Sequence, residues 1–332
     1  MTHPKLTFFC ELPAGALQAL FADARVVSDL LALGARVSLG ILDLTAERAA
    51  VVHQLNEAGI PVVAWQLLPK EQGYWFNLDN ATQATARYVE FKRWTAKHQL
   101  RWDGIGLDIE PDIREMQGLR TDPLAWLPVL LKRTFDEERL RRAQMAYNAL
   151  MAQIRCDDYR VDVYHLPFVV DERAAGSTLL QRLAGLVDLT ADREVLMLYT
   201  SLMRPRGPAV LWSYAKNAQS VGLGVTGGGV DVTADIPPLN WDEFSRDLVL
   251  ASRWARDIHV FSLEGCVQQG FLPRLQSFDW EQQDSPPRGL SAQVAAARTA
   301  LRAGLWASAH PSLLLAAGLA MLAWASRRHR RT

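Results

Sequence analysis

The stretch 102–112, WDGIGLDIEPD, constrains the fold of this chain more than any other. Large apolar residues stand at 105, 107 and 109, and Gly106, Asp108 and Glu110 alternate with them. Successive side chains of a β-strand point to opposite faces, so this run predicts a strand with one apolar face and one face that carries carboxylates. Burial of an unpaired carboxylate is costly, so two of them in a central strand indicate a functional site rather than a solvated edge.

Strand-like and helix-like runs alternate along most of the chain. We expect strands at 6–12, 36–42, 61–68, 104–110, 162–170, 194–201, 220–226 and 258–263. Amphipathic runs between them predict helices at 46–58, 81–98, 124–155, 177–187, 209–219 and 241–254. Eight strands that each lead into a helix form a (β/α)8 TIM barrel, whose strand ends meet at one mouth. A doubly wound open sheet is the alternative, but no glycine-rich phosphate loop follows the first strand.

Composition bears on the classes of partner. The 36 basic and 36 acidic residues give a formal net charge of zero, and no basic stripe with interleaved aromatics occurs, so nucleic acid is not an expected partner. Cys10, Cys156 and Cys266 lack the spacing of zinc ligands or of a disulfide framework. We therefore expect no metal and no cofactor.

The C-terminal part of the sequence follows a different pattern. A barrel domain over 1–280 leads into a polar, proline-containing linker and an alanine-rich juxtamembrane helix over 281–303. His310 is the only strongly polar residue in 304–326, which is long enough to span a bilayer, and an arginine-rich tail occupies 327–332. We expect a single-pass, C-terminal transmembrane helix with the lipid bilayer as a partner, and a buried C-terminal helix is the alternative.

Two patterns predict opposite sides of the membrane for the barrel. The arginines after the anchor favour a cytoplasmic C-terminus, which places the barrel outside the cytoplasm. Residues 1–5 lead directly into a strand-like run, so we expect no removable signal peptide, and this favours a cytoplasmic barrel. Unpaired cysteines agree with the second arrangement.

Residues 103–110, DGIGLDIE, resemble the Asp-Gly-x-Asp-x-Asp-x-Glu signature of family 18 glycoside hydrolases, the chitinase and endo-N-acetylglucosaminidase group. That signature lies on the fourth strand of a TIM barrel, and the strand count above also makes this strand the fourth. Gly106 stands where the family usually carries its second aspartate. The resemblance covers this strand, one tyrosine and the barrel plan.

The resemblance implies an O-glycosyl hydrolase that acts on a glycan with N-acetylhexosamine units. Glu110 corresponds to the general acid that protonates the glycosidic oxygen. Asp108 corresponds to the residue that orients the substrate acetamido group, which is itself the nucleophile. Tyr199, at the end of the sixth strand, corresponds to a tyrosine that hydrogen-bonds this acetamide, although a packed core tyrosine is an equal interpretation. The nearby charge of Asp108 favours a protonated Glu110.

Other polar and aromatic residues near predicted strand ends are candidates for contact with a sugar, because pyranose rings present apolar faces that pack on flat aromatics. Glu11 follows the first strand, and we expect most such residues to be structural. A carboxylate after the eighth strand would face Glu110 across the barrel, and the separation of the two would decide between retention and inversion. The candidate substrate-binding residues are Asp103, Asp112, Gln66, Trp75, Asn77, His165 and Glu264.

Two other functions fit the same strand. A metal-dependent phosphodiester hydrolase barrel would use Asp108, Glu110 and Asp112 as oxygen ligands for magnesium or calcium. A barrel that binds carbohydrate without catalysis agrees with the missing aspartate. The presence of Glu110 favours an enzyme over the binding protein.

Overall fold

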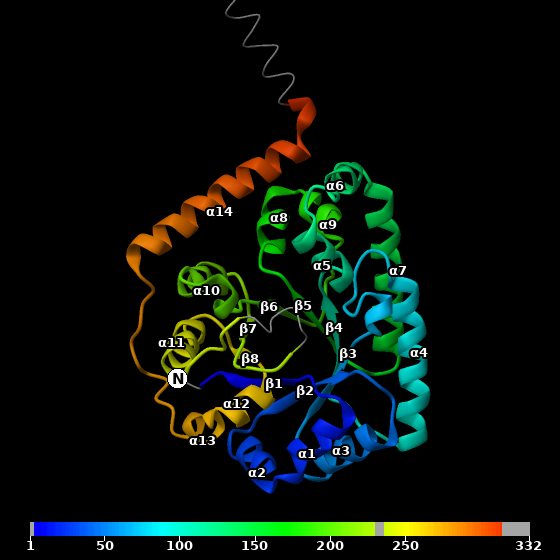
Figure 1. The fold of residues 1–332 in the computed structure, drawn as a ribbon, viewed down its shortest axis with the longest axis vertical. Coiled ribbons are helices and arrows are strands. Elements are labelled where there is room, and N and C mark those ends of the chain that lie inside the picture. The colour runs from blue at the N-terminus through cyan, green and yellow to red at the C-terminus, as the bar shows by residue number, and fades with distance from the viewer. Residues whose placement is uncertain (1–2, 230–235, 314–332) are drawn as a thin grey trace, which may run out of the picture.

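The structure, a computed structural model, describes residues 3–229 and 236–313 (Figure 1). Eight parallel strands form a closed barrel in sequence order, and pairing of the first strand with the eighth completes the ring. This arrangement confirms the predicted (β/α)8 barrel. The strands are β1 (Lys5–Cys10), β2 (Arg36–Ile41), β3 (Val62–Gln66), β4 (Gly104–Ile109), β5 (Val161–His165), β6 (Arg193–Met197), β7 (Ser220–Gly224) and β8 (Asp257–Phe261).

Helices surround the barrel and connect its strands (Figure 1). The predicted helix 124–155 is in fact two helices, because the side chain of Asp136 accepts a hydrogen bond from the Arg139 N–H and starts a new helix there. The helices are α1 (Ala14–Ala22), α2 (Ala24–Ala32), α3 (Ala46–Glu57), α4 (Ala81–His98), α5 (Ile113–Thr121), α6 (Leu127–Thr134), α7 (Glu137–Cys156), α8 (Val169–Ala175), α9 (Leu179–Ala184), α10 (Gly207–Ala215), α11 (Trp241–Ser252), α12 (Leu263–Gln268), α13 (Phe271–Gln276) and α14 (Arg288–Ala309), with short 3-10 helices η1 (Lys70–Gln72) and η2 (Thr200–Met203).

The alternation in β4 separates two apolar layers. Its large residues at 105, 107 and 109 belong to the main core between the strands and the helices. Gly106 and Asp108 occupy the other face, which lines the barrel interior. A second cluster fills that interior, where the ring of Phe9 packs edge-on against Trp65 at 5.1 Å and against Tyr164 at 4.8 Å. The barrel is therefore a packed core that opens only at its ends.

Helix α14 is attached to the side of the barrel, along α8 and α10 (Figure 1). Its Arg298 is buried and donates hydrogen bonds to both carboxylate oxygens of Asp171 at 2.8 to 3.2 Å. The guanidinium also lies 3.7 Å over the ring of Tyr214. Residues 281–287 of the predicted linker carry no helix or strand, whereas the juxtamembrane helix expected before residue 303 is part of this docked helix.

The predicted transmembrane helix lies only partly within the described residues. Residues 304–309 belong to α14, where Leu305 is buried against the barrel. The greater part, 314–326, and the basic tail 327–332 lie outside the described residues. Between residues 3 and 229 and between 236 and 313, no helix is both long enough and apolar enough to cross a membrane.

Candidate active site

Asp108 and Glu110 stand at the carboxyl end of β4, at the mouth of the barrel. The alternation that buries Ile109 beneath the helices turns Asp108 inward, where its Oδ2 accepts a hydrogen bond of 3.0 Å from Nε1 of Trp65. Its Oδ1 is buried and has no hydrogen-bond partner among the described residues. A buried polar atom without a partner is uncommon in folded proteins, so this oxygen makes Asp108 a candidate for contact with a ligand.

Burial governs the protonation of this pair. It raises the pKa of Glu110 to about 7, and the neighbouring Asp108 side chain offsets part of the effect. Burial also raises the pKa of Asp108, and the charges of Glu110 and Glu11 raise it further. Two neighbouring carboxyl groups that resist double ionisation hold a proton near neutral pH, as a general acid must.

Tyr199 joins the two acids from β6. It precedes the helix η2, and its ring packs against Phe261 with 5.7 Å between the ring centroids. Burial, followed by the charges of Asp108 and Glu110, raises its pKa, so the phenol stays protonated and can donate a hydrogen bond. The fold thus brings together the three residues that the sequence singled out as catalytic.

Tyr164 of β5 occupies the space beside Gly106. A β-carbon added at Gly106 would lie 2.8 Å from Cζ of Tyr164, and still closer to the hydroxyl oxygen. That hydroxyl is 2.8 Å from Oγ of Ser38, with both residues buried. The inward position that precedes Asp108 on β4 is therefore filled from the neighbouring strand, and no aspartate fits there.

Glu11 is a fourth ionisable group at the mouth. It follows β1, and its Oε1 accepts a hydrogen bond from the hydroxyl of Tyr74. Burial raises the pKa of Glu11 to about 8; the hydrogen bond from Tyr74 lowers it, while the charges of Glu264 and Glu110 add to the rise. Tyr74 adopts a positive φ of 66°, which is uncommon for an aromatic residue and is found where the surroundings hold a functional side chain in place.

Glu264 faces Glu11 rather than Glu110. Its Oε1 accepts a hydrogen bond of 3.3 Å from the backbone N–H of Glu11, and its Oε2 is buried without a partner among the described residues. Gly228 covers it so closely that a β-carbon there would lie 2.7 Å from Cγ of Glu264. Burial raises the pKa of Glu264 to about 7. The acid whose charge acts on both Asp108 and Tyr199 from across the mouth is Glu11.

Two acids that flank the β4 motif do not join this group. Asp103 is exposed at the amino end of β4 and pairs with Arg36 at 3.2 Å. Since a strand rises about 3.3 Å per residue, Asp103 stands about 23 Å along the strand from Glu110. Asp112 caps α5 by accepting a hydrogen bond of 2.8 Å from the Arg114 N–H, and it also pairs with the Arg114 side chain. Asp108, Glu110 and Asp112 therefore do not form the oxygen-ligand set of a metal-dependent hydrolase.

The candidates around β3 lie in packed surroundings. Alternation puts Gln66 on the face opposite Trp65, beneath the helices, where both of its polar side-chain atoms are buried without a partner among the described residues. Trp75 is buried in the interior cluster with its ring edge-on to Tyr74 at 5.4 Å. Asn77 bonds within its own loop, where its Oδ1 accepts from the Asp79 N–H at 3.0 Å. None of these three presents an open platform for a sugar.

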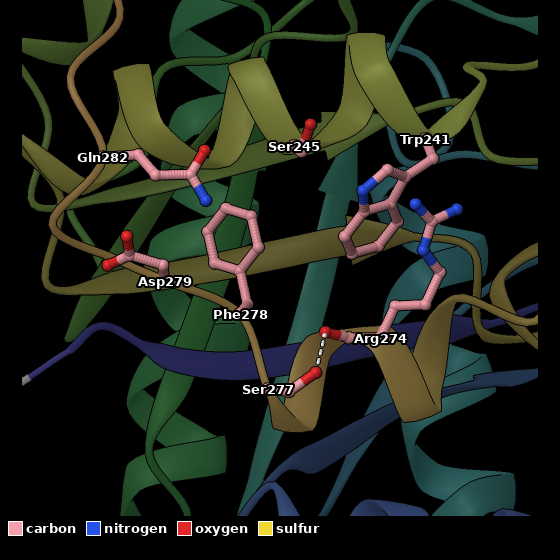
Figure 2. A pocket seen from close by; sticks show the side chains of 7 residues that line it. All are labelled: Trp241, Ser245, Arg274, Ser277, Phe278, Asp279 and Gln282. Atoms are coloured by element: carbon pink, nitrogen blue, oxygen red, sulfur yellow. Dashed lines mark hydrogen bonds between the residues drawn. The ribbon is translucent and has the colours of Figure 1, made fainter.

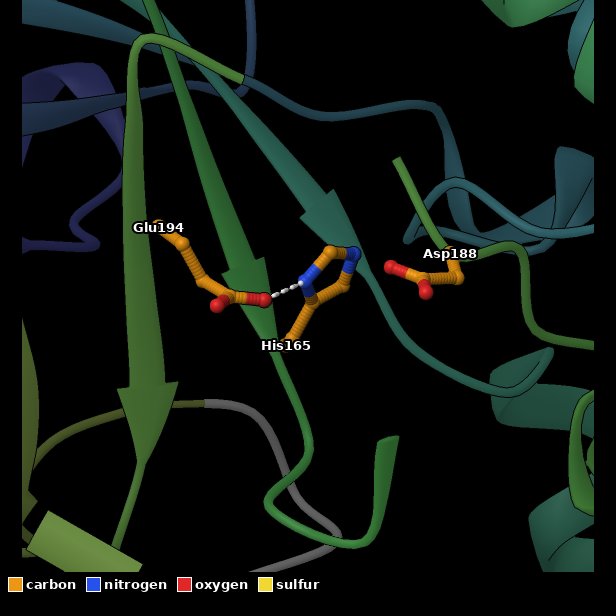
Figure 3. Close-up of side chains that lie close together, drawn as sticks. All are labelled: His165, Asp188 and Glu194. Carbon is orange, nitrogen blue, oxygen red and sulfur yellow. Dashed lines mark hydrogen bonds and ion pairs between the residues drawn. The ribbon is translucent and has the colours of Figure 1, made fainter. Parts of the chain in front are cut away.

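His165 lies outside the barrel wall, because its neighbour Tyr164 points inward. Together with Asp188 and Glu194 it forms, within the described part of the chain, a group whose potential ligand atoms lie within 4.8 Å of one another (Figure 3). Arg173 already donates hydrogen bonds to Asp188 at 2.7 Å and to Glu194 at 2.6 Å. The positive guanidinium of Arg173 lies between the two carboxylates, where a metal ion would have to bind. The group therefore fits an ion-pair network rather than a metal centre.

A separate shallow pocket of about 260 Å³ lies beside α11 and α13 (Figure 2). In it the guanidinium of Arg274 stacks over the ring of Trp241 at 4.0 Å. These elements belong to the outer layer of helices, so the pocket is distinct from the barrel mouth. The lining residues are Trp241, Ser245, Arg274, Ser277, Phe278, Asp279 and Gln282.

Comparison with known proteins gives a likeness of fold. No protein-family model and no curated protein sequence matches this chain. Among solved structures, the glycoside hydrolase domain of PgaB (BpsB) from Bordetella bronchiseptica superimposes with a TM-score of 0.50 at 11% identity, over 86% of this chain and 100% of that one. The 3-keto-D-glucoside 4-epimerase YcjR from E. coli gives a TM-score of 0.45 at 13% identity, over 83% and 98% of the two chains.

The chitinase ChiW from Paenibacillus sp. gives a TM-score of 0.42 at 11% identity, over 83% of this chain and 43% of that one. At such identities a superposition establishes the barrel fold and nothing about the reaction. Function must therefore be argued from the residues at the mouth.

Proposed function

We propose that this protein is a glycoside hydrolase in which Glu110 is the general acid. The observation that carries the proposal is the inward pair Asp108 and Glu110 at the carboxyl end of β4, with burial raising the pKa of Glu110 to about 7. A carboxyl group with this pKa is protonated in a useful fraction of molecules at neutral pH, as proton donation to a glycosidic oxygen requires. Active sites of TIM barrels lie at this end of the strands.

The resemblance to family 18 assigns the remaining roles. The acetamido oxygen of the substrate attacks the anomeric carbon, Glu110 transfers its proton to the departing oxygen, and a cyclic oxazolinium intermediate forms. Water then opens the intermediate while Glu110 takes back a proton. Asp108 would orient the acetamide through its free Oδ1, and Tyr199 would donate a hydrogen bond to the acetamide oxygen. The substrate class is therefore a glycan with N-acetylhexosamine units.

Substitution of Glu110 by Gln tests this proposal. A panel of aryl glycosides that includes N-acetylglucosaminides would be assayed with the wild type and with Glu110→Gln, and sugar binding would be measured by calorimetry. We expect hydrolysis to fall about 10² to 10⁴-fold while binding is retained, because the amide preserves the shape of the side chain but cannot give the proton. Glu71→Gln, an exposed residue of η1, serves as the control with unchanged activity. Full activity of Glu110→Gln would refute the assignment.

One structural feature favours a carbohydrate-binding barrel without catalysis as the second candidate. Tyr164 fills the place of the family's middle aspartate, so the charge relay of the full motif is incomplete. Under this alternative the wild type would bind N-acetylglucosamine oligomers with no turnover, and Glu110→Gln would bind them equally well. The panel above separates the two functions, because only the hydrolase releases the aryl group.

We also propose that the C-terminal apolar run anchors the protein to a membrane. Because 304–309 belong to the docked helix α14, the run left for insertion is 310–326, whose 17 residues lie near the lower limit for spanning a bilayer. Flotation of the full chain with lipid vesicles on a density gradient tests this anchor. Protein that stays at the bottom of the gradient would refute it.

A further inference from the structure

Helix α6 carries its apolar side chains on the outside of the protein. The helix buries none of its residues. Four large side chains at helical spacing of three and four residues form a single stripe across the helix and its two flanking turns. In this stripe Leu124 is 80% exposed, Leu127 53%, Leu131 59% and Phe135 83%, and we call it the α6 stripe. Exposed apolar side chains gathered in this way mark an interaction surface.

The side of α6 nearest the protein carries Leu130, Arg133 and Thr134, which are half-buried. Arg133 is only 11% exposed and pairs with Glu115 of α5. A second hydrogen bond of 3.4 Å runs from Arg133 to the carbonyl oxygen of Leu183 in α9. A helix on the surface of a protein in water turns its apolar stripe toward the core. The α6 stripe, in contrast, points away from the protein, which indicates that something apolar covers it outside.

The end of α14 lies close to the same surface. The Oγ atom of Ser308 lies 3.3 Å from the Oγ atom of Ser177, which stands two residues before the first residue of α9. Arg133 of α6 contacts Leu183, near the other end of α9. The two contacts are therefore separated by roughly the length of α9, whose six residues extend about 9 Å at 1.5 Å per residue. Trp306 is 45% exposed and Leu313 is 54% exposed near this end. Figure 1 places α6 and the C-terminal end of α14 at the same end of the molecule.

We infer that the α6 stripe lies against a lipid bilayer. This inference rests on the proposed anchor, because the chain that follows α14 is apolar from Leu313 to Ala325 and ends in arginines. An apolar helical stripe near the described end of α14 would meet the acyl boundary of a membrane that holds the following segment, and interfacial helices sink into that boundary by about 5 to 10 Å. Lys132, exposed next to Leu131, adds attraction to anionic headgroups.

Docking of α6 also affects the barrel mouth. Helix α5 starts at Ile113, three residues after Glu110, and residues 122–126 connect it to α6. A bilayer in contact with the α6 stripe therefore holds the acid-lined mouth near the membrane surface. The favoured substrate is then a glycan presented at that surface rather than one free in solution.

Spin labels on the full chain test the inference. Leu131→Cys and, as a matched control, Leu31→Cys would be labelled in a Cys156→Ser background, since the other two cysteines are buried. Leu31 is 49% exposed on α2, which lies at the opposite end of the molecule in Figure 1. After flotation with vesicles of phosphatidylcholine and phosphatidylglycerol, the accessibility of each label to oxygen and to a water-soluble nickel chelate is measured.

We expect the label at 131 to become more accessible to oxygen than to the nickel chelate. The label at 31 should stay more accessible to the nickel chelate than to oxygen. Protein that floats while the label at 131 remains open to the chelate would overturn the inference and leave the anchor intact. Shielding of position 131 from both reagents would mean that another protein surface or a second copy covers the stripe, and would also overturn it. A failure to float would overturn the anchor and this inference together.

Discussion

The ring of Tyr164 fills the space in which a side chain on Gly106 would have to stand. A β-carbon at Gly106 would come within 2.8 Å of the tyrosine Cζ, closer than real side chains approach. The small glycine on β4 thus leaves room for the large tyrosine on the neighbouring strand β5. Asp108 consequently has Trp65 as its hydrogen-bond donor and the charges of Glu110 and Glu11 as its electrostatic neighbours.

We predict that Gly106→Ala destabilises the protein by about 1 to 3 kcal/mol, because an extra carbon in a packed interior forces its neighbours aside. The loss should shrink when Tyr164→Phe removes the closest atom, the hydroxyl oxygen. Urea unfolding of the single and double variants measures both effects. Gly15→Ala is the control, since a β-carbon there meets nothing within 4 Å. Equal costs in the Tyr and Phe backgrounds would show that the tyrosine hydroxyl does not define this space.

The protonation of Glu110 predicts the alkaline limb of the pH profile. In the proposed hydrolase Glu110 donates a proton only in its protonated form, which predominates below its pKa of about 7. We expect kcat/KM to fall about tenfold per pH unit above that value. Rates on an aryl N-acetylglucosaminide across the pH range measure the limb. A profile that stays level up to pH values well above 7 would mean that another group supplies the proton.

The barrel was predictable because the local pattern of apolar and polar residues identifies its strands and helices. The residues at 105, 107 and 109 alternate with Gly106 and Asp108, and this period alone predicts which face of β4 lines the interior. Strand order required one further argument, the regular succession of strands and helices. The break between α6 and α7 was missed, since Asp136 acts as a cap only in the folded conformation.

The grouping of the candidate residues was predictable where one strand carries them. Asp108 and Glu110 are neighbours on the same strand, so spacing alone brings them together. Glu11 is a lone acid after β1, and only closure of the barrel sets it opposite the pair. Asp103 belongs to the same motif in sequence, yet the length of β4 carries it to the other end of the barrel. The orientation of His165 depends on its parity along β5, which the sequence pattern did not resolve.

The raised pKa of Glu11 predicts a gain of stability on its neutralisation. Between the ordinary glutamate pKa of 4.5 and about 8, the folded protein retains a proton that the unfolded chain has released, so this group lowers stability as the pH rises through that range. Glu11→Gln does not titrate and keeps an acceptor for Tyr74. We expect its stability advantage over the wild type to grow by about 5 kcal/mol between about pH 4 and about pH 9, since each unit of pKa shift is worth about 1.4 kcal/mol.

Chemical denaturation at a series of pH values measures this difference. Glu57→Gln, an exposed residue at the end of α3, should follow the wild type at every pH. A Glu11→Gln curve parallel to that of the wild type would mean that Glu11 ionises normally in the folded protein.

The last prediction concerns the attachment of α14 through Asp171, which receives two arginines of unequal burial. The Arg298 side chain is 8% exposed and that of Arg302 is 40% exposed. Loss of the buried partner leaves a buried carboxylate with less compensation, so Arg298→Gln should cost about 3 to 5 kcal/mol, whereas a partly solvated pair contributes about 1 kcal/mol or less. Thermal unfolding compares the two variants, and limited proteolysis at 281–287 reports release of the helix. Equal costs for Arg298→Gln and Arg302→Gln would show that burial of the first arginine does not hold α14 on the barrel.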